Sequence, residues 1–128
     1  MRLLLDTHVF IWLDIARDRL SESAQQAIKT PENELYLSLA SVWEMQIKIQ
    51  LGKLHLNTPL SDTLIAQQQT NGIQLLPIQI NHILALSNLR QHHRDPFDRL
   101  LIAQVQVENL TLVTNDPRIS LYDVAQLW

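Results

Sequence analysis

Short apolar runs alternate with helical segments along the whole chain, and this alternation is the feature that most constrains the fold. Strand-like runs occupy residues 2–5, 35–39, 73–78 and 111–114. Helical patterns are expected at 7–14, 21–29, 41–51, 60–70, 81–89 and 96–109. Alternating strands and helices with short connections favour a mostly parallel sheet that helices flank on both faces. We predict one α/β domain over residues 1–128, in which 120–128 add a last strand or helical turn.

Several single residues support these boundaries. Ser21 is a good N-cap for the second helix. Gly52 and Gly72 stand where helices should end, as C-terminal glycines do. Pro77 cannot donate a backbone hydrogen bond, so the run at 73–78 is expected near the edge of the sheet.

Composition narrows the possible chemistry. The chain has 128 residues, which suits one core, and it contains no cysteine. Disulfides, zinc thiolate sites and thiol nucleophiles are therefore excluded. Neither glycine lies in a glycine-rich turn after a strand, so phosphate-binding loops and dinucleotide fingerprints are absent.

Net charge and hydropathy limit which partners the protein can bind and where in the cell it is expected. The net charge of −3 is unlike that of a basic nucleic-acid binder, so a polyanionic substrate would need local cations or metal ions. No apolar stretch approaches the roughly 20 residues of a membrane span. The apolar segment that follows Met1 is too short for a signal peptide, and we expect a cytoplasmic protein without membrane contact.

Four carboxylates stand where apolar runs meet expected helices. Asp6 follows the run at 3–5, Glu44 follows the run at 35–39, Asp98 precedes the run at 100–103, and Asp116 follows the run at 110–113. The carboxyl ends of parallel strands share one edge, where α/β proteins bind their ligands. Oxygen ligands without cysteine favour Mg²⁺ or Mn²⁺ over zinc.

Helix capping offers an alternative explanation for each acid. Ser41 and Glu44 match a capping box, and Asp95 could cap a helix that has Asp98 in its first turn. Asp116 precedes a proline and could also be a cap. Asp6 or Thr7 could cap the first helix, but Asp6 directly follows a buried run and would need a donor or a cation to stay charged. Capping does not explain why all four acids would share one edge.

Other polar and aromatic residues allow two interpretations each. His92 and His93 could bind metal or phosphate, although adjacent loop histidines are more often solvated. Trp12 and Trp43 fit a core or an interface better than a base-stacking platform. The arginines of this region could meet phosphates or balance the carboxylates; they are Arg90, Arg94 and Arg99.

Four segments in order resemble the PIN-domain family, and most closely the VapC-type toxins of toxin–antitoxin pairs. They are Leu5-Asp6-Thr7-His8, Ser41-Val42-Trp43-Glu44, the stretch from His93 to Gln104, and the stretch from Leu112 to Asp116. The resemblance covers Met1 to about Tyr122. It implies a PIN-like fold and a ribonuclease that uses Mg²⁺ or Mn²⁺. It also implies a homodimer and a small antitoxin that covers the active site, with Phe10, Trp12 and Trp43 contributing to those surfaces.

The same resemblance assigns the site residues. The catalytic quartet falls on Asp6, Glu44, Asp98 and Asp116, and metal binding on Asp6, Asp98 and Asp116. Thr114 matches the hydroxyl residue that precedes the last acid. Asp95 is expected as a cap or an outer residue of the metal site, and Arg94 and Arg99 are expected beside the phosphates.

Two other functional classes compete with the nuclease. One is a catalytically inactive PIN fold that serves as a binding module. The other is a receiver-like phosphoacceptor domain, which normally needs a lysine after a late strand. The lysines here are Lys29, Lys48 and Lys53, and none follows a late strand.

Overall fold

A five-stranded sheet forms the centre of the computed structural model, which describes all of residues 1–128. The strands are β1 (Arg2–Leu5), β2 (Glu34–Ser38), β3 (Gln74–Leu76), β4 (Thr111–Val113) and β5 (Ala125–Leu127). Their order is β3-β2-β1-β4-β5, and every pairing is parallel. This confirms the predicted parallel sheet, and β3 lies at its edge as Pro77 indicated.

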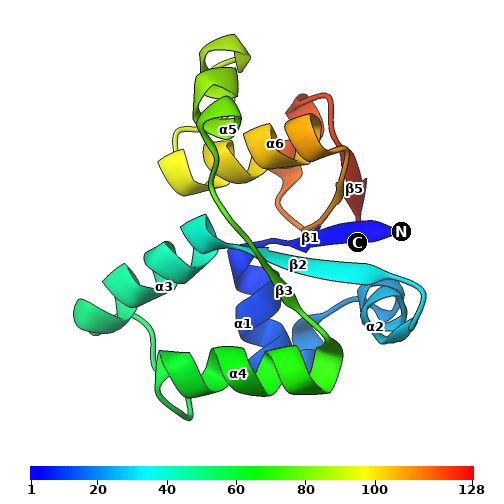
Figure 1. The fold of residues 1–128 in the computed structure, drawn as a ribbon, viewed down its shortest axis with the longest axis vertical. Helices are drawn as coiled ribbons and strands as arrows, with labels where there is room; N and C mark the ends of the chain where they lie inside the picture. Colours follow the sequence, from blue (N-terminus) through cyan, green and yellow to red (C-terminus); the bar gives the residue numbers. More distant parts are fainter.

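Helices cover both faces of this sheet. They are α1 (Thr7–Ile15), α2 (Glu22–Lys29), α3 (Leu39–Gln50), α4 (Leu60–Asn71), α5 (Ile80–Ala85) and α6 (Pro96–Glu108). Short 3₁₀ turns occupy Arg17–Arg19, Leu86–Asn88 and Pro117–Leu121. Figure 1 shows α1 to α4 below the sheet and α5 and α6 above it, so the predicted α/β architecture is confirmed.

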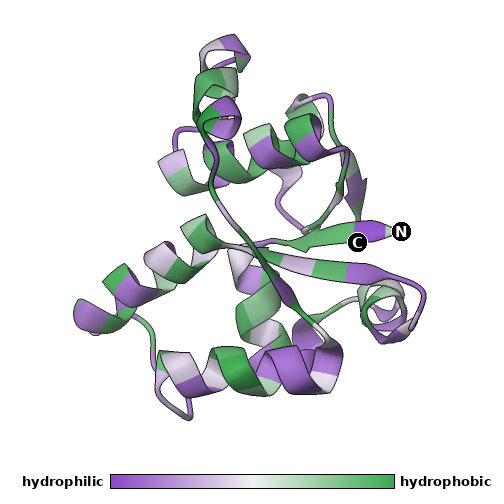
Figure 2. Ribbon diagram, viewed as in Figure 1, coloured by the Kyte–Doolittle hydropathy of each residue, from purple (hydrophilic) through white to green (hydrophobic).

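The sheet separates two hydrophobic cores. Side chains alternate between the faces of a strand, so Leu3 and Leu5 pack into one core while Leu4 packs into the other. The hydrophobic colouring of β1 in Figure 2 reflects burial on both faces. Phe10 is fully buried in the core beside α1, so the expectation that it contributes to an interface is wrong.

Most observed helix ends match those predicted from the sequence, but the beginning of α3 does not. Ser21 caps α2 by accepting a hydrogen bond from the Ala24 N–H at 3.0 Å, and α4 ends at Gly72 with φ of 66°. At α3, Ser38 accepts from the Ala40 N–H at 3.0 Å, and the helix begins at Leu39. The predicted capping box of Ser41 and Glu44 is therefore wrong, which leaves the Glu44 carboxylate without that role.

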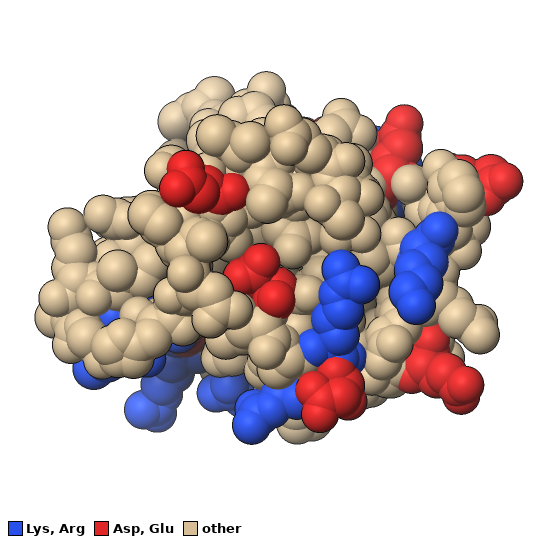
Figure 3. Space-filling view, turned by 90° about the horizontal axis from the view of Figure 1, so that it is seen from below, with Lys and Arg blue, Asp and Glu red and all other residues tan.

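The molecular surface carries mixed charge. Figure 3 shows acidic and basic side chains interspersed on one face, without a continuous basic field, in keeping with the net charge of −3. None of the helices combines the length and the apolarity that crossing a membrane would require.

Candidate metal centre

The strand order creates a crevice at the carboxyl ends of β1 and β4. The chain proceeds from β1 to β2 on one side, whereas β4 pairs with β1 on the other side. Ligands of open parallel sheets bind at such a change of direction. Asp6 directly follows β1 and Thr114 directly follows β4. The Asp6 N–H donates to the Val113 carbonyl oxygen at 3.1 Å, which holds the two strand ends together.

An acidic cleft of about 410 Å³ opens at this crevice. It brings together all four acids that the sequence singled out, although they come from four different segments. Its lining consists of Asp6, His8, Trp12, Glu44, Lys48, Asp95, Asp98, Asn115, Asp116, Pro117 and Arg118.

Asp6 is buried at the end of β1, with 6% of its surface exposed. Burial raises its pKa, against the lowering effects of a Thr114 hydrogen bond and the nearby His8. Thr114 Oγ1 donates to Asp6 Oδ2 at 2.7 Å and accepts the Asp116 N–H at 3.1 Å. Asp6 Oδ1 also accepts the His8 N–H at 3.3 Å, so Asp6 caps α1 as well. Thr114 thus links two of the acids.

Glu44 projects from the second turn of α3 and is 4% exposed. Its Oε2 pairs with Lys48 Nζ at 2.9 Å, but its Oε1 is buried without any hydrogen-bond partner. The hydroxyl of Thr7 donates to Ser41 Oγ at 2.8 Å, which joins α1 to α3. A buried carboxylate oxygen without a donor costs roughly 1–3 kcal/mol or more, and a cation in the cleft would satisfy it.

Asp98 stands in the first turn of α6. Asp95 caps that helix, because its Oδ1 accepts the N–H of Phe97 at 2.8 Å and that of Asp98 at 3.4 Å. Burial, followed by the charges of the neighbouring carboxylates, raises the pKa of Asp98 to about 8. Without a cation, Asp98 therefore holds a proton at neutral pH.

His93 occupies a position that the sequence did not reveal. It is 1% exposed, so the expectation of a solvated loop histidine is wrong for this residue. Its Nε2 lies 3.0 Å from Asp98 Oδ2 and 3.1 Å from Asp116 Oδ2. Its Nδ1 accepts the Asp95 N–H at 3.2 Å, so Nε2 is the ring nitrogen that donates. His93 Nε2 is hydrogen-bonded to Asp116 and also lies close to the Asp98 carboxyl group.

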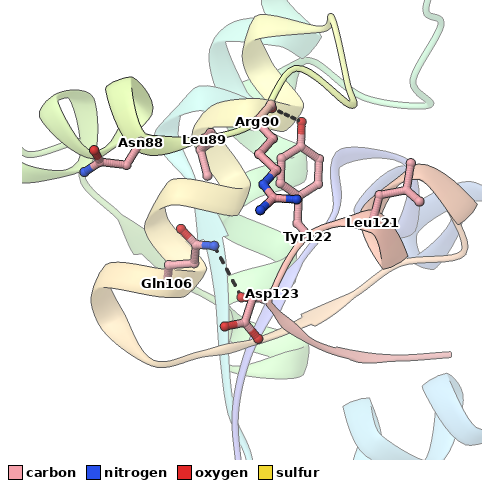
Figure 4. Close-up of a pocket in the computed structure, with 7 residues that line it drawn as sticks. All are labelled: Asn88, Leu89, Arg90, Gln106, Leu121, Tyr122 and Asp123. Carbon is pink, nitrogen blue, oxygen red and sulfur yellow. Dashed lines mark hydrogen bonds between the residues drawn. The ribbon is translucent and has the colours of Figure 1, made fainter.

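Tyr122 holds the loop that carries His93. Its hydroxyl accepts the N–H of His92 at 3.1 Å and that of His93 at 2.9 Å, and it donates to the Arg90 carbonyl at 2.8 Å. Figure 4 shows Tyr122 and Arg90 beside a separate hollow of about 290 Å³. Asp123 is the single carboxylate of that hollow, so it lacks the acidic cluster of the cleft.

The two arginines expected beside phosphates lie elsewhere. The Arg99 guanidinium donates to the backbone carbonyls of Arg90 at 2.9 Å and His93 at 3.4 Å, and to the Tyr122 hydroxyl at 3.4 Å. Arg94 is exposed and does not line the cleft. Arg118 lines it instead, with Nη2 at 3.1 Å from Asp116 Oδ2. No local signal distinguished Arg118 from the other arginines.

Asp116 differs from the other acids in its electrostatics. Burial tends to raise its pKa, but hydrogen bonds from Arg118 and His93 outweigh that effect and lower it. Asp116 also accepts the Arg118 N–H at 2.9 Å and so begins the 3₁₀ turn at Pro117–Leu121, as its proline signature suggested.

The donor set of the cleft fits a hard divalent cation. Its acidic oxygens come from Asp6, Glu44, Asp95, Asp98 and Asp116, and no thiol is present. Ligand atoms of His93, Asp98 and Asp116 lie within 4.8 Å of one another. The unpartnered Glu44 oxygen and the raised pKa of Asp98 both identify charge that a cation would stabilise.

Comparisons with known proteins place this geometry in a wider context. The family model described as PIN domain matches residues 3–126. A structure of VapBC2 from Rickettsia felis bound to a DNA fragment from their promoter is similar, with TM-score 0.74 and 16% identity, covering 99% of this chain and 98% of that chain. VapBC-1 from nontypeable Haemophilus influenzae gives 0.67 and 19%, covering 99% and 97%. FitAcB from Neisseria gonorrhoeae gives 0.64 and 20%, covering 98% and 96%. No curated protein matches the chain.

Proposed function

The chain belongs to the PIN domain family, and from that premise we propose that it is a metal-dependent endoribonuclease and the toxin of a toxin–antitoxin pair. The observation that carries the nuclease proposal is the convergence of Asp6, Glu44, Asp98 and Asp116 in one cleft. Similarity in fold to the VapBC complexes supports the toxin assignment.

We assign the cation to Asp6, Asp98 and Asp116, which would hold Mg²⁺ or Mn²⁺. When bound, such an ion lowers the pKa of water and stabilises developing negative charge on phosphate oxygens. His93 and Thr114 keep these carboxylates in position, since His93 bridges Asp98 and Asp116 and Thr114 donates to Asp6.

Glu44 has the remaining chemical role. Its buried Oε1 has no donor, so it is available to orient the attacking water and accept its proton. Lys48 and Arg118 place positive charge at the wall of the cleft and offset the approaching phosphate. Glu44 would accept a proton of the water as the water oxygen bonds to phosphorus, and the 3′ oxygen would leave and take a proton from bulk water. The products are a 5′-phosphate and a 3′-hydroxyl.

Cleavage of mixed RNA by the purified protein tests the proposal. Activity should appear with Mg²⁺ or Mn²⁺, vanish in EDTA and leave 5′-phosphate ends. Asp6→Asn should abolish cleavage while circular dichroism shows an intact fold. Full activity in EDTA, or a 2′,3′-cyclic phosphate product, would refute the mechanism. A folded protein that binds RNA but cleaves nothing with either metal would instead be an inactive binding module.

We also propose a single domain over residues 1–128, a homodimer and a small antitoxin partner. Trp43 supports an association surface, because it is 60% exposed and packs edge-on against Phe97 with ring centroids 5.2 Å apart. Light scattering should give twice the chain mass, and a monomer at working concentration would count against the dimer. A small neighbouring gene for a DNA-binding protein is expected for the antitoxin.

A further inference from the structure

A strip of aromatic side chains leads out of the acidic cleft. The aromatic strip consists of His8, Trp12 and Trp128. The ring centroids of His8 and Trp12 are 6.0 Å apart, and those of Trp12 and Trp128 are 6.1 Å apart. The guanidinium carbon of Arg19 lies 5.9 Å from the Trp12 centroid. Because His8 and Trp12 also line the cleft, the strip begins beside the carboxylates.

The fold explains why these rings meet. His8 and Trp12 are four residues apart on α1 and therefore share one face of that helix. Trp128 directly follows β5, and the Leu127 carbonyl accepts the Thr114 N–H at 3.2 Å. The carboxyl end of β5 thus lies beside that of β4. All three rings stand at the edge of the sheet that carries the acids.

Exposure divides the strip into a support and two accessible rings. Trp12 is half-buried and packs against the core beside α1, which agrees in part with the expectation of a core tryptophan. His8 is exposed, and 37% of the Trp128 surface is open to solvent. His8 and Trp128 are therefore accessible to a ligand, and Trp12 packs between them and the core.

We infer that the aromatic strip binds the bases of single-stranded RNA that passes through the cleft, an inference that rests on the proposed ribonuclease function. A chain with a net charge of −3 and an acidic cleft does not attract phosphates through its overall field. Aromatic rings can stack on any base, and this stacking does not depend on the net charge of the protein. Bases within a duplex are already stacked, so the strip selects single strands and loops.

Positive groups match the path of such a strand. Arg19 stands over Trp12, and Arg118 and Lys48 line the cleft where the strip begins. These three cations border the rings and the acids, and each can meet a phosphate of a strand whose bases stack on the strip. This continuity with the cleft favours RNA over a protein segment as the occupant.

Fluorescence anisotropy with a labelled, short oligoadenylate tests the inference without cleavage. All measurements use EDTA and an Asp98→Asn background, which together prevent hydrolysis. Trp128→Leu should weaken binding about 5- to 150-fold, the effect of losing one stacked base. Trp128→Phe retains a ring and should restore most of the affinity. Trp43→Leu changes an exposed tryptophan outside the strip and should have no effect.

Two further measurements make the result specific. An abasic strand with the same phosphates should bind weakly to every variant, because it cannot stack. The chain has three tryptophans, so in a Trp43→Phe protein all tryptophan emission comes from the strip and oligoadenylate should quench it. Wild-type affinity in Trp128→Leu, or equal binding of the abasic strand, would overturn the inference. So would a strip that binds a protein partner and no oligoadenylate.

These outcomes separate the strip from the proposed function. Metal-dependent cleavage by a protein whose binding is indifferent to Trp128 would refute the strip alone. Base-dependent binding by a protein that cleaves nothing would support the strip and refute the nuclease.

Discussion

Replacing Asp98 with asparagine should flatten the pH dependence of stability of the metal-free protein. Burial and the surrounding carboxylates raise the pKa of Asp98 from 3.8 to about 8 in the folded state. A raised acid pKa means that the folded protein binds the proton more tightly than the unfolded chain does. The contribution of Asp98 therefore favours folding at low pH and is lost as the pH rises from about 4 to about 8.

The change in the free energy of unfolding can be calculated from the width of the pH window. Each pH unit in this window changes the free energy of unfolding by about 1.4 kcal/mol, so the three units between about pH 5 and pH 8 amount to about 4 kcal/mol. The Asp98 side chain is 18% exposed, which leaves little solvent screening. An asparagine side chain has no proton to lose, so the Asp98→Asn variant should gain about 4 kcal/mol over the wild type across the interval.

Urea unfolding in EDTA at a series of pH values measures this difference. Asp62→Asn makes the same substitution at an exposed position in the first turn of α4 and controls for the loss of one carboxyl group. Parallel stability curves for wild type and Asp98→Asn would refute the reasoning, because Asp98 would then not be packed among the other acids. Mg²⁺ or Mn²⁺ competes with the Asp98 proton, so added metal should stabilise the wild type more at about pH 8 than at about pH 5.

Two further substitutions test the groups that hold the acids. Thr114→Val removes the donor to buried Asp6 and should cost about 1.5–3 kcal/mol in urea unfolding and reduce cleavage, whereas Thr114→Ser should retain both; equal stability of the valine and serine variants would contradict the role of the hydroxyl. Tyr122→Phe leaves the N–H groups of His92 and His93 without their acceptor and should destabilise the protein by about 1–3 kcal/mol. It should also lower kcat more than it raises KM, because Tyr122 acts on the loop that carries His93; unchanged kcat would show that the loop keeps its position without that hydroxyl.

Local patterns predicted most of the fold and the four acids that meet in the cleft. Alternating apolar runs located the strands, and strand ends in a parallel sheet share an edge, so Asp6 and Asp116 could be placed together from sequence. The residue at which α3 begins was harder to predict from the sequence. Ser38 and Ser41 are both plausible caps, and the choice depends on Ser41 packing against Thr7, which lies 34 positions away.

The surroundings of the acids depend on long-range contacts that no short pattern records. His93 reaches the cleft because Tyr122, 29 residues further along, accepts its backbone N–H. Arg99 resembled a phosphate ligand in sequence, but the carbonyls of the loop before α6 occupy its guanidinium. The sequence placed arginines close to Asp98 along the chain, but it predicted neither their partners nor the position of Arg118 in the cleft.

A second histidine clarifies what His93 does. The His82 Nδ1 accepts the Gln79 N–H at 3.0 Å, and its Nε2 lies 2.9 Å from Glu108 Oε1. His93 has the same arrangement, with a backbone N–H on Nδ1 and carboxylate on Nε2, but it meets two carboxylates where His82 meets one. His82 therefore anchors α5 to α6, whereas His93 holds two acids of the cleft close together.

This difference bears on how the cleft takes up a cation. The Asp98 and Asp116 carboxyl groups lie on either side of one buried His93 nitrogen before any metal binds, so little side-chain entropy remains to be lost on binding. The obstacle that remains is the proton that Asp98 retains because of its raised pKa. Because burial also raises the pKa of Asp6, metal affinity should depend on pH through both acids, and Asp98→Asn should lose affinity at about pH 8 while keeping the geometry around His93.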